Sequence, residues 1–362
     1  MTAGPRQILS PLAIKGRVAR PQPKGLPVIG MGFNELPFGP TERVAEAIAE
    51  VGRRPNRYGE PTCRALREAI AGRFGLDPDE IICGNGSEEL LDLIARSFVR
   101  PGDEIVFPEF GYIQFPIVAN RLNARPAKAR EGAYATNIDS ILSVISDKTG
   151  MIFLANPNNP TGTAISAAEI ARLADEAPTH VPIVIDLAYG EFLGLDHCAA
   201  VHDLVAARPN LIVTRTFSKA FGLAGLRVGW AHAPRALIPG FYAARAMGPV
   251  NAMAQAAAVA ALADMDAAMA RVDWIVAERE RMRAALDSAG VETLDSRANF
   301  LLCRFRSPDA PSPDEFVEAL YDATGIVVIG IREAGLEAFF RVSVSAEDHN
   351  DLFLEFVSGL QC

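Results

Sequence analysis

Short apolar runs alternate with segments of helical periodicity between residues 81 and 230, and this order constrains the fold more than any other feature. The apolar runs cover residues 81–83, 104–107, 151–154, 181–185 and 211–213. Strand–helix–strand order predicts a mostly parallel, doubly wound sheet with helices on both faces. The fold class expected for this part of the chain is therefore three-layer α/β.

Four polar residues come at or just after the ends of predicted strands. They are Ser87, Asn159, Asp186 and Lys219. Open α/β sheets bind their ligands outside the carboxyl ends of the strands. The shared position therefore predicts that these residues, although far apart in sequence, meet in one site.

The stretch of residues 214–230 predicts a cofactor. Lys219 lies among hydroxyl-bearing and small residues, and Arg227 follows it eight positions later. A lysine in a tight, largely apolar loop can lose its proton and attack a carbonyl, and hydroxyls with an arginine suit a phosphate. Pyridoxal phosphate needs both an aldehyde trap and a phosphate clamp. The alternative is a glycine-rich turn with a solvated lysine.

The loop of residues 84–87 opens directly into an apolar-periodic helix. A strand, a glycine loop and a helix start present free backbone N–H groups to a phosphate, although a plain helix cap at Ser87 explains the same pattern. We expect the carboxylates of Glu88 and Glu89 to turn away, because they would repel a phosphate. Phe110 or Tyr112 is placed to stack on a cofactor ring, and the alternative is that both belong to the core.

Composition narrows the class of protein. The net charge of −9 argues against nonspecific binding to nucleic acid or an anionic membrane, and no apolar run is long enough to span a bilayer. The five cysteines form no CxxC pair and the five histidines do not cluster, so we expect no metal. A reducing cytoplasm fits these cysteines best.

The expected domains follow from the predicted elements. Residues 1–40 are expected to form an N-terminal arm and part of a small domain, 41–248 the large cofactor-binding domain, and 249–362 a linker helix and a small α+β domain. Thr41 is expected to cap the first helix. In the small domain, Arg341 stands alone in an apolar strand. A buried arginine is costly unless paired, and a substrate carboxylate or a structural ion pair would satisfy it.

Together these residues resemble the fold type I pyridoxal-phosphate-dependent aminotransferases of class I/II, and within them the histidinol-phosphate aminotransferase group. The resemblance runs from Asn34 to Arg341. Its most specific strings are Ser-Lys-Ala-Phe-Gly-Leu-Ala-Gly-Leu-Arg-Val-Gly at 218–229 and Asn-Pro-Asn-Asn-Pro-Thr-Gly at 156–162. It implies pyridoxal 5'-phosphate as cofactor and transfer of an amino group from an amino-acid-type donor to a 2-oxo acid, with 2-oxoglutarate expected.

The resemblance also implies residue roles. Lys219 links covalently to the cofactor and then shuttles a proton at the substrate α-carbon, while Asp186 pairs with the pyridine nitrogen. Asn159 and Tyr189 hydrogen-bond the ring 3'-oxygen. The phosphate contacts are Gly86, Ser87, Glu88 through its backbone, Thr216, Ser218 and Arg227.

Four further residues complete the implied site. Phe110 takes the stacking place, with Tyr112 as the alternative. Tyr58 reaches the cofactor phosphate and substrate of a neighbouring subunit, which implies a homodimer. Asn34 contacts substrate, and Arg341 grips the substrate α-carboxylate.

Two departures from the group bear on the substrate. The chain has Asn-Glu-Leu-Pro at 34–37, where the group usually has Asn-Glu-Asn-Pro. Ile329 stands where the group usually has an arginine that binds the substrate phosphate, and the nearest arginine is Arg332. Unless Arg332 compensates, these departures favour an aromatic or other neutral amino acid over histidinol phosphate as the donor.

Two other functions remain open at this point. A decarboxylase of the threonine-phosphate type shares nearly all these residues, and release of carbon dioxide without consumption of a keto acid would distinguish it. A non-catalytic ligand-binding domain, as in transcriptional regulators that reuse this fold, is the third hypothesis. The acidic charge and the lack of a helix-turn-helix extension weigh against it.

Overall fold

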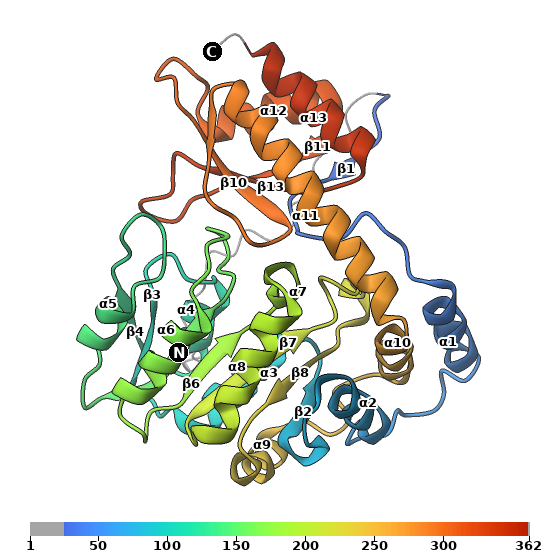
Figure 1. Cartoon of the computed structure of the whole chain (residues 1–362), viewed down its shortest axis with the longest axis vertical. Coiled ribbons are helices and arrows are strands. Elements are labelled where there is room, and N and C mark those ends of the chain that lie inside the picture. Colours follow the sequence, from blue (N-terminus) through green and yellow to red (C-terminus); the bar gives the residue numbers. More distant parts are fainter. Residues whose placement is uncertain (1–24, 361–362) are drawn as a thin grey trace, which may run out of the picture.

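The computed structural model describes residues 25–360 and shows two lobes. The lower lobe in Figure 1 is the large domain, and the upper lobe holds the C-terminal part of the chain. The expected arm falls mostly on residues 1–24, which lie outside the described range. The architecture is the expected α/β fold with a smaller α+β domain.

The large domain is built on a sheet that has seven strands within residues 25–360. All pairings are parallel except those of β8, which runs antiparallel to β2 and β7. The sequence-based expectation omitted two of these strands, β4 and β8. The order across the sheet is β2 (Ile81–Gly84), β8 (Gly229–His232), β7 (Leu211–Thr216), β6 (Ile183–Asp186), β5 (Thr149–Ala155), β3 (Glu104–Pro108) and β4 (Arg125–Ala129).

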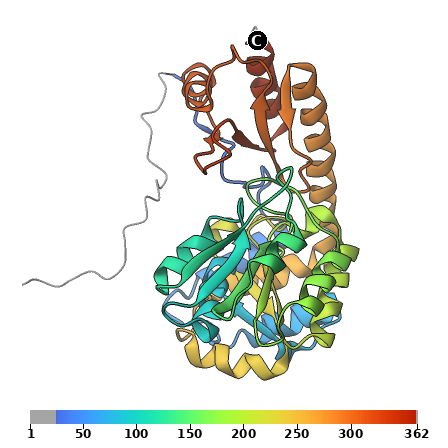
Figure 2. The ribbon, with the colours of Figure 1, turned by 90° about the vertical axis from the view of Figure 1, so that its left-hand side faces the viewer.

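Helices cover both faces of this sheet (Figure 2). Because helices bury both faces, the strands are apolar on both sides, and successive side chains point to opposite faces. In β5, for example, Met151 and Phe153 pack in the cluster with α3, α4 and α9, whereas Ile152 and Leu154 pack in the cluster with α5, α6 and α8. The bounds of these helices are α3 (Ser87–Phe98), α4 (Gln114–Arg121), α5 (Ile138–Ser143), α6 (Ala167–Glu176), α8 (Leu195–Ala207) and α9 (Ile238–Ala244).

Side-chain caps set where several helices begin. The Thr41 hydroxyl accepts a hydrogen bond from the backbone N–H of Val44, which confirms the predicted start of α1 (Glu42–Gly52). Ser166 and Glu169 form a reciprocal capping box at α6, and such a box satisfies two otherwise unpaired donors. After α1 the chain continues through a loop into α2 (Arg64–Phe74).

Two helices connect the domains. α10 (Ala252–Ala263) packs against α1 and α2 of the large domain, and α11 (Met265–Ser288) continues from it into the upper lobe (Figure 1). The upper lobe contains the sheet β12–β13–β10–β9 and the helices α12 (Pro313–Thr324) and α13 (Glu347–Gly359). Its strands are β12 (Ile329–Gly330), β13 (Phe340–Ser343), β10 (Phe300–Phe305) and β9 (Val291–Thr293).

The segment before α1 belongs to the small domain by its pairing. β1 (Ile29–Gly30) runs parallel to β11 (Ile326–Val327), and the backbone N–H of Ser343 donates to the carbonyl of Met31. Val328 separates β11 from β12, and β12 pairs with β13 instead. The chain from 31 onward then passes between the lobes, which brings residues 33–35 to the large domain's sheet edge.

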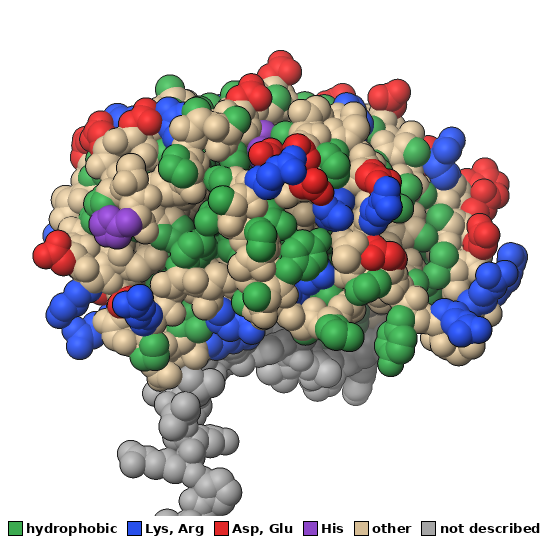
Figure 3. Space-filling view, turned by 90° about the horizontal axis from the view of Figure 1, so that it is seen from below, with side chains coloured by type: hydrophobic (Ala, Val, Ile, Leu, Met, Phe, Trp, Pro, Cys, Tyr) green, Lys and Arg blue, Asp and Glu red, His purple; other side chains and the backbone are tan. Residues whose placement is uncertain are grey.

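The underside of the large domain carries basic and acidic side chains interspersed with apolar ones, without a broad field of one charge sign (Figure 3). Across the described chain, no helix has the length and apolarity that crossing a membrane requires. The same residues contain no group of three His, Cys, Asp or Glu placed to hold a metal ion.

Candidate active site

A cavity of about 570 Å³ lies at the carboxyl ends of the parallel strands, with walls from both domains. Asp186 ends β6, Asn159 follows β5, and Lys219 follows β7. The four residues expected to meet at the sheet edge all line this one cavity. The predicted site residues among its walls are Asn34, Ser87, Glu88, Asn159, Asp186, Tyr189, Thr216, Ser218, Lys219, Arg227 and Arg341.

Lys219 points its amine into the cavity. Its Nζ donates hydrogen bonds to the carbonyl oxygens of Phe33 at 3.2 Å and Asn34 at 3.1 Å, and it lies 5.5 Å from the ring centre of Tyr189. The segment entering from the small domain thus holds the amine in place. An amine fixed in this way is positioned for a carbonyl carbon that enters the cavity.

Asp186 is the buried acid of the site, with 2% of its surface exposed. The Thr214 hydroxyl donates to its Oδ1 at 2.9 Å. Burial raises the pKa of Asp186 to about 7, and the Thr214 hydrogen bond opposes that rise. A carboxylate held here needs a cationic partner to be fully ionised, which a protonated ring nitrogen would supply.

A hydrogen-bonded chain joins the two domains across the cavity. The amide Nδ2 of Asn34 donates to the Tyr189 hydroxyl at 2.8 Å, and the Ser343 hydroxyl donates to Asn34 Oδ1 at 2.9 Å. On the other side, the Arg341 guanidinium donates to Asn159 Oδ1, and to the carbonyl of Gly32 at 2.8 Å. Because Asn159 Oδ1 is occupied, its amide presents the Nδ2 donor to a ligand oxygen.

Hydroxyls, a glycine and an arginine form one corner of the cavity. Thr216 donates to Ser218 between their hydroxyls at 3.0 Å, and Arg227 Nη1 lies 3.5 Å from the Ser218 hydroxyl. Gly86 precedes the first residue of α3 with φ +87°, and a Cβ there would lie 2.5 Å from Arg227 Nη2. Only glycine lets the guanidinium approach the helix start so closely. This corner suits a phosphate.

The prediction that the carboxylate of Glu88 turns away from the site is wrong. Its side chain lines the cavity, because its Oε1 accepts a hydrogen bond from the Tyr112 hydroxyl at 2.7 Å and its Oε2 lies 3.6 Å from Arg227 Nη2. Glu89 turns back toward the backbone of its own loop instead, where the Asn85 N–H donates to it.

Tyr112, and not Phe110, lies at the cavity wall. Phe110 is 8% exposed and belongs to a cluster with Leu302, Leu336 and Phe339 of the small domain. A turn between them, closed by the Gly111 N–H on the Pro108 carbonyl at 2.8 Å, sends the two rings in different directions. The structure therefore places Tyr112, the alternative, and not Phe110, at the wall where a cofactor ring would be covered.

Tyr58 lies in the loop between α1 and α2 and is fully exposed. It does not line its own chain's cavity. Several cavity residues were not predicted as site residues from the sequence. Ile113 and Pro157 line the wall, and the Thr214 hydroxyl donates a hydrogen bond to the Asp186 carboxylate. Thr214 had a usable signal, because it lies two residues before Thr216 on a strand and so faces the same side.

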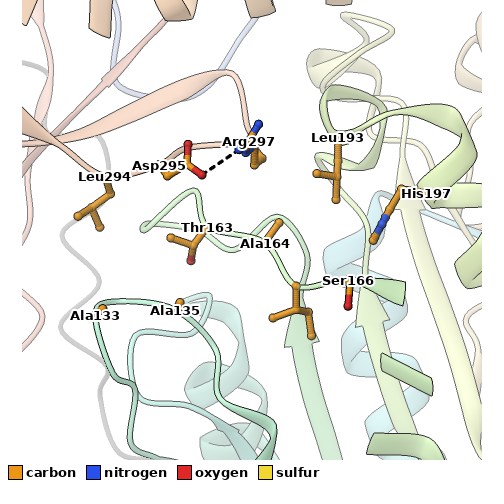
Figure 4. Close-up of a pocket in the computed structure, with 11 residues that line it drawn as sticks. Ala133, Ala135, Thr163, Ala164, Ser166, Leu193, His197, Leu294, Asp295 and Arg297 are labelled. Atoms are coloured by element: carbon orange, nitrogen blue, oxygen red, sulfur yellow. Dashed lines mark hydrogen bonds and ion pairs between the residues drawn. The ribbon is translucent and has the colours of Figure 1, made fainter. Parts of the chain in front are cut away.

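A second cavity, of about 520 Å³, separates the domains near the Asn-Pro-Asn-Asn-Pro-Thr-Gly loop (Figure 4). Loops of the large domain at 133–135 and 163–166 face residues 294–297 of the small domain, where Arg297 pairs with Asp295 at 2.9 Å. The Arg297 N–H also donates to the Gly162 carbonyl at 2.7 Å. None of the residues predicted for the site lines this cavity.

The sequence matches known proteins over most of its length. The family described as aminotransferase class I and II matches residues 27–357. A histidinol-phosphate aminotransferase of Ruegeria pomeroyi is 41% identical over 322 residues, covering 88% of this chain and 87% of that protein. The chain belongs to the class I and II aminotransferases.

Other aminotransferases of the family support the same assignment. A histidinol-phosphate aminotransferase of Sphingopyxis alaskensis is 40% identical over 334 residues, covering 90% of this chain and 88% of that one. The crystal structure of histidinol-phosphate aminotransferase from Sinorhizobium meliloti in complex with pyridoxal-5'-phosphate matches with a TM-score of 0.87 and 28% identity, over 91% of this chain and 90% of that chain. This aminotransferase is therefore pyridoxal-phosphate-dependent.

The cavity fits this cofactor by its own chemistry. It combines a directed amine at Lys219, a buried acid at Asp186 and the donor-lined corner at Arg227. A likeness to the L-threonine-O-3-phosphate decarboxylase of Porphyromonas gingivalis, at 21% identity and a TM-score of 0.77, shows the shared fold alone.

Proposed function

We propose that this aminotransferase takes its amino group from an aromatic or other neutral amino acid and passes it to a 2-oxo acid. The observation that carries the proposal is the side chain at position 329. Ile329 lines the cavity, where it presents an apolar surface instead of a guanidinium. The substrate side chain meeting this wall is best matched by an uncharged group.

Arg332 does not compensate for Ile329. Its Nη2 lies 3.0 and 3.1 Å from the two carboxylate oxygens of Asp314 on α12, and its side chain is 59% exposed. It is absent from the cavity wall. The arginine nearest in sequence is thus directed to a surface ion pair.

The charges around the cavity support a substrate with one anionic group. Within the described chain its basic lining residues are Lys219, Arg227 and Arg341. Lys219 and Arg227 are assigned to the cofactor, which leaves Arg341 for the substrate. The side chain of Glu35 lines the same cavity, and its carboxylate would repel a second anion.

The roles of this chain's residues follow from the geometry. When bound, pyridoxal phosphate withdraws electrons from the substrate α-carbon. Lys219 would hold the cofactor and move the proton at that carbon, and Asp186 would keep the ring nitrogen protonated. Asn159 and Tyr189 would bind the ring oxygen, Tyr112 would cover the ring, and the corner at Arg227 would hold the phosphate. Arg341 would orient the substrate carboxylate.

Histidinol phosphate is the second candidate donor. The relatives at 40% and 41% identity carry that activity in their names, and Arg341 could take its phosphate because this donor has no carboxylate. A half-reaction screen decides between the two. Purified holoenzyme is mixed with single amino acids or with histidinol phosphate, and loss of the cofactor's visible band is followed. Faster conversion by histidinol phosphate than by phenylalanine, tyrosine or leucine would overturn the neutral-donor proposal.

The same screen tests the decarboxylase alternative. An aminotransferase accumulates the amino form of the cofactor until a 2-oxo acid is added, whereas a decarboxylase releases carbon dioxide without that requirement. We expect turnover to depend on the 2-oxo acid and no carbon dioxide to form.

Replacing Arg341 by alanine should raise KM for every carboxylate substrate and lower kcat/KM by roughly 10²–10³-fold, because two charge-assisted hydrogen bonds are lost. Arg341→Lys is the control, since it keeps the charge and removes the bidentate geometry. Steady-state kinetics measure both. An unchanged KM in Arg341→Ala would make its contacts with Asn159 and Gly32 purely structural.

Replacing Ile329 by arginine should lower KM for doubly anionic acceptors such as 2-oxoglutarate by roughly 10–100-fold, because one charge-assisted contact is added. Activity with neutral donors should fall at the same time. Ile329→Leu is the matched control and should change neither. If the arginine variant shows no preference for the second anion, position 329 does not set specificity.

We further propose a cytoplasmic homodimer in which Tyr58 reaches the partner's cavity. The full exposure of this tyrosine supports the assignment, because its ring is free to contact a second chain. Light scattering of the holoenzyme measures the assembly. In a mixed dimer of Tyr58→Ala and Lys219→Ala chains, one cavity would have both its own Lys219 and the partner's Tyr58. Mixing the two variants should therefore restore partial activity only if each site uses both chains.

A further inference from the structure

Arg215 is a buried cation on the side of β7 that faces away from the cavity. Its side chain is 1% exposed, and it lies between Thr214 and Thr216, which face the cavity side. Alternation along a strand separates these directions. The strand that carries the Asp186 contact and the phosphate corner therefore carries a charge on its reverse side.

Glu191 is the partner of this cation. Arg215 Nη2 and Glu191 Oε1 are 2.5 Å apart, and the Glu191 side chain is 2% exposed. Glu191 lies in α7 (Gly190–Leu193), two residues after Tyr189. Burial opposes the charged form of Arg215, but the proximity of the Glu191 carboxylate and of Cys198 outweighs it, so the pKa of Arg215 is raised.

Few other contacts hold the two groups. Arg215 Nε and Nη1 and Glu191 Oε2 have no hydrogen-bond partner among the described residues. The guanidinium lies 4.5 Å from the ring centre of Phe74 and 5.4 Å from that of Trp230. The ion pair is thus the polar contact that fixes α7 against β7.

Two side-chain links join the same pair of segments on opposite sides, in addition to the backbone hydrogen bond from the Leu187 N–H to the Thr214 carbonyl. On the cavity side, Thr214 donates to Asp186 at 2.9 Å. On the reverse side, Arg215 binds Glu191. Residues 186–191 carry the acid and the tyrosine of the site, and residues 214–219 carry the phosphate hydroxyls and Lys219.

We propose that the Arg215–Glu191 ion pair is a positioning pair that sets the place of the Tyr189 hydroxyl relative to Lys219. The inference rests on the cofactor roles proposed above for those two residues. A hydrogen-bond donor near the lysine–cofactor link changes the pKa of that link. Loosening α7 therefore changes the protonation of the link even though neither Arg215 nor Glu191 touches the cofactor.

The readout is the pH midpoint of the holoenzyme's visible absorbance band. Charged or titratable groups around this link and around the pair stay unchanged in the variants. Around the link they are Asp186, Tyr189, Tyr112, Glu88, Glu35, Arg227 and Arg341, and around the pair they are Cys198 and His202. Glu191→Gln also removes a charge, whereas Arg215→Lys keeps both charges of the pair, so a midpoint shift seen in both variants reports the geometry of Tyr189.

Glu191→Gln should move the midpoint by about half a unit or more and lower kcat about tenfold, with KM changed less than twofold. Arg215→Lys is the second variant, in case the first fails to fold, and should give a smaller shift in the same direction. Glu278→Gln is the matched control. It breaks another pair at 2.5 Å, with Arg281 in the small domain, and should lower Tm without moving the midpoint.

Equal midpoints and kcat in wild type, Glu191→Gln and Arg215→Lys, with only Tm lowered, would show that the pair merely stabilises the fold. Tyr189→Phe separates this from a failure of the proposed function. If Tyr189→Phe also leaves the midpoint unchanged, the assumed role of Tyr189 is wrong. If it moves the midpoint and the pair variants do not, the positioning role alone is overturned.

Discussion

Lys219→Ala should abolish transamination, lowering kcat by roughly 10⁴-fold or more, because one side chain both holds the cofactor and moves the proton. The visible band of the lysine-linked cofactor should disappear, although the cofactor should still bind through the phosphate corner. Spectra of the reconstituted variant and single-turnover assays measure the two effects separately.

The control for this variant is Lys148→Ala, which removes an exposed lysine just before β5, at the end of that strand opposite to the cavity. It should keep both the band and the activity. If the band persisted in Lys219→Ala, the nucleophile would have to be another lysine. The assignment of this cavity as the cofactor site would then be wrong.

Asp186→Asn should lower kcat by roughly 10²–10³-fold, because a preorganised charge is removed from the ring nitrogen that it stabilises. Cofactor binding should persist through Lys219 and the Arg227 corner. Near-normal turnover would contradict the role of Asp186.

The same substitution should have opposite effects on stability with and without cofactor. Burial raises the pKa of Asp186 to about 7, from about 3.9 in an unfolded chain. Between these values the unfolded chain releases the proton while the folded chain keeps it, so this carboxyl destabilises the apoenzyme progressively as pH rises. Asp186→Asn removes that effect.

Thermal unfolding at pH 5 and pH 8 measures the prediction. Without cofactor, the Tm of Asp186→Asn minus the Tm of wild type should be larger at pH 8 than at pH 5. The holoenzymes should show the reverse order at pH 8, because the cofactor's ring cation stabilises the charged carboxylate. The opposite result would refute the raised pKa of Asp186: the Tm of the wild-type apoenzyme would exceed that of the apo variant by more at pH 8 than at pH 5.

Tyr112 illustrates where local pattern ceases to determine a site. Phe110 and Tyr112 both follow β3, both are aromatic and both suit a cofactor ring. Their directions depend on the Gly111–Pro108 turn and on the apolar cluster of the small domain that accepts Phe110. That cluster draws its other buried members from residues 294 to 339, so no short window of sequence contains both it and Phe110.

The sequence by itself determined the layered α/β fold, most strand positions, the Thr41 cap and the family, because these depend on short-range periodicity and on continuous strings such as residues 156–162 and 218–229. Tertiary structure alone decided that Glu88 faces the cavity, that Arg332 is taken by Asp314, and that Arg215 meets Glu191. The physical reason is that a side chain's direction and ion-pair partner follow from packing between distant elements, whereas helix and strand propensities act over a few neighbouring residues.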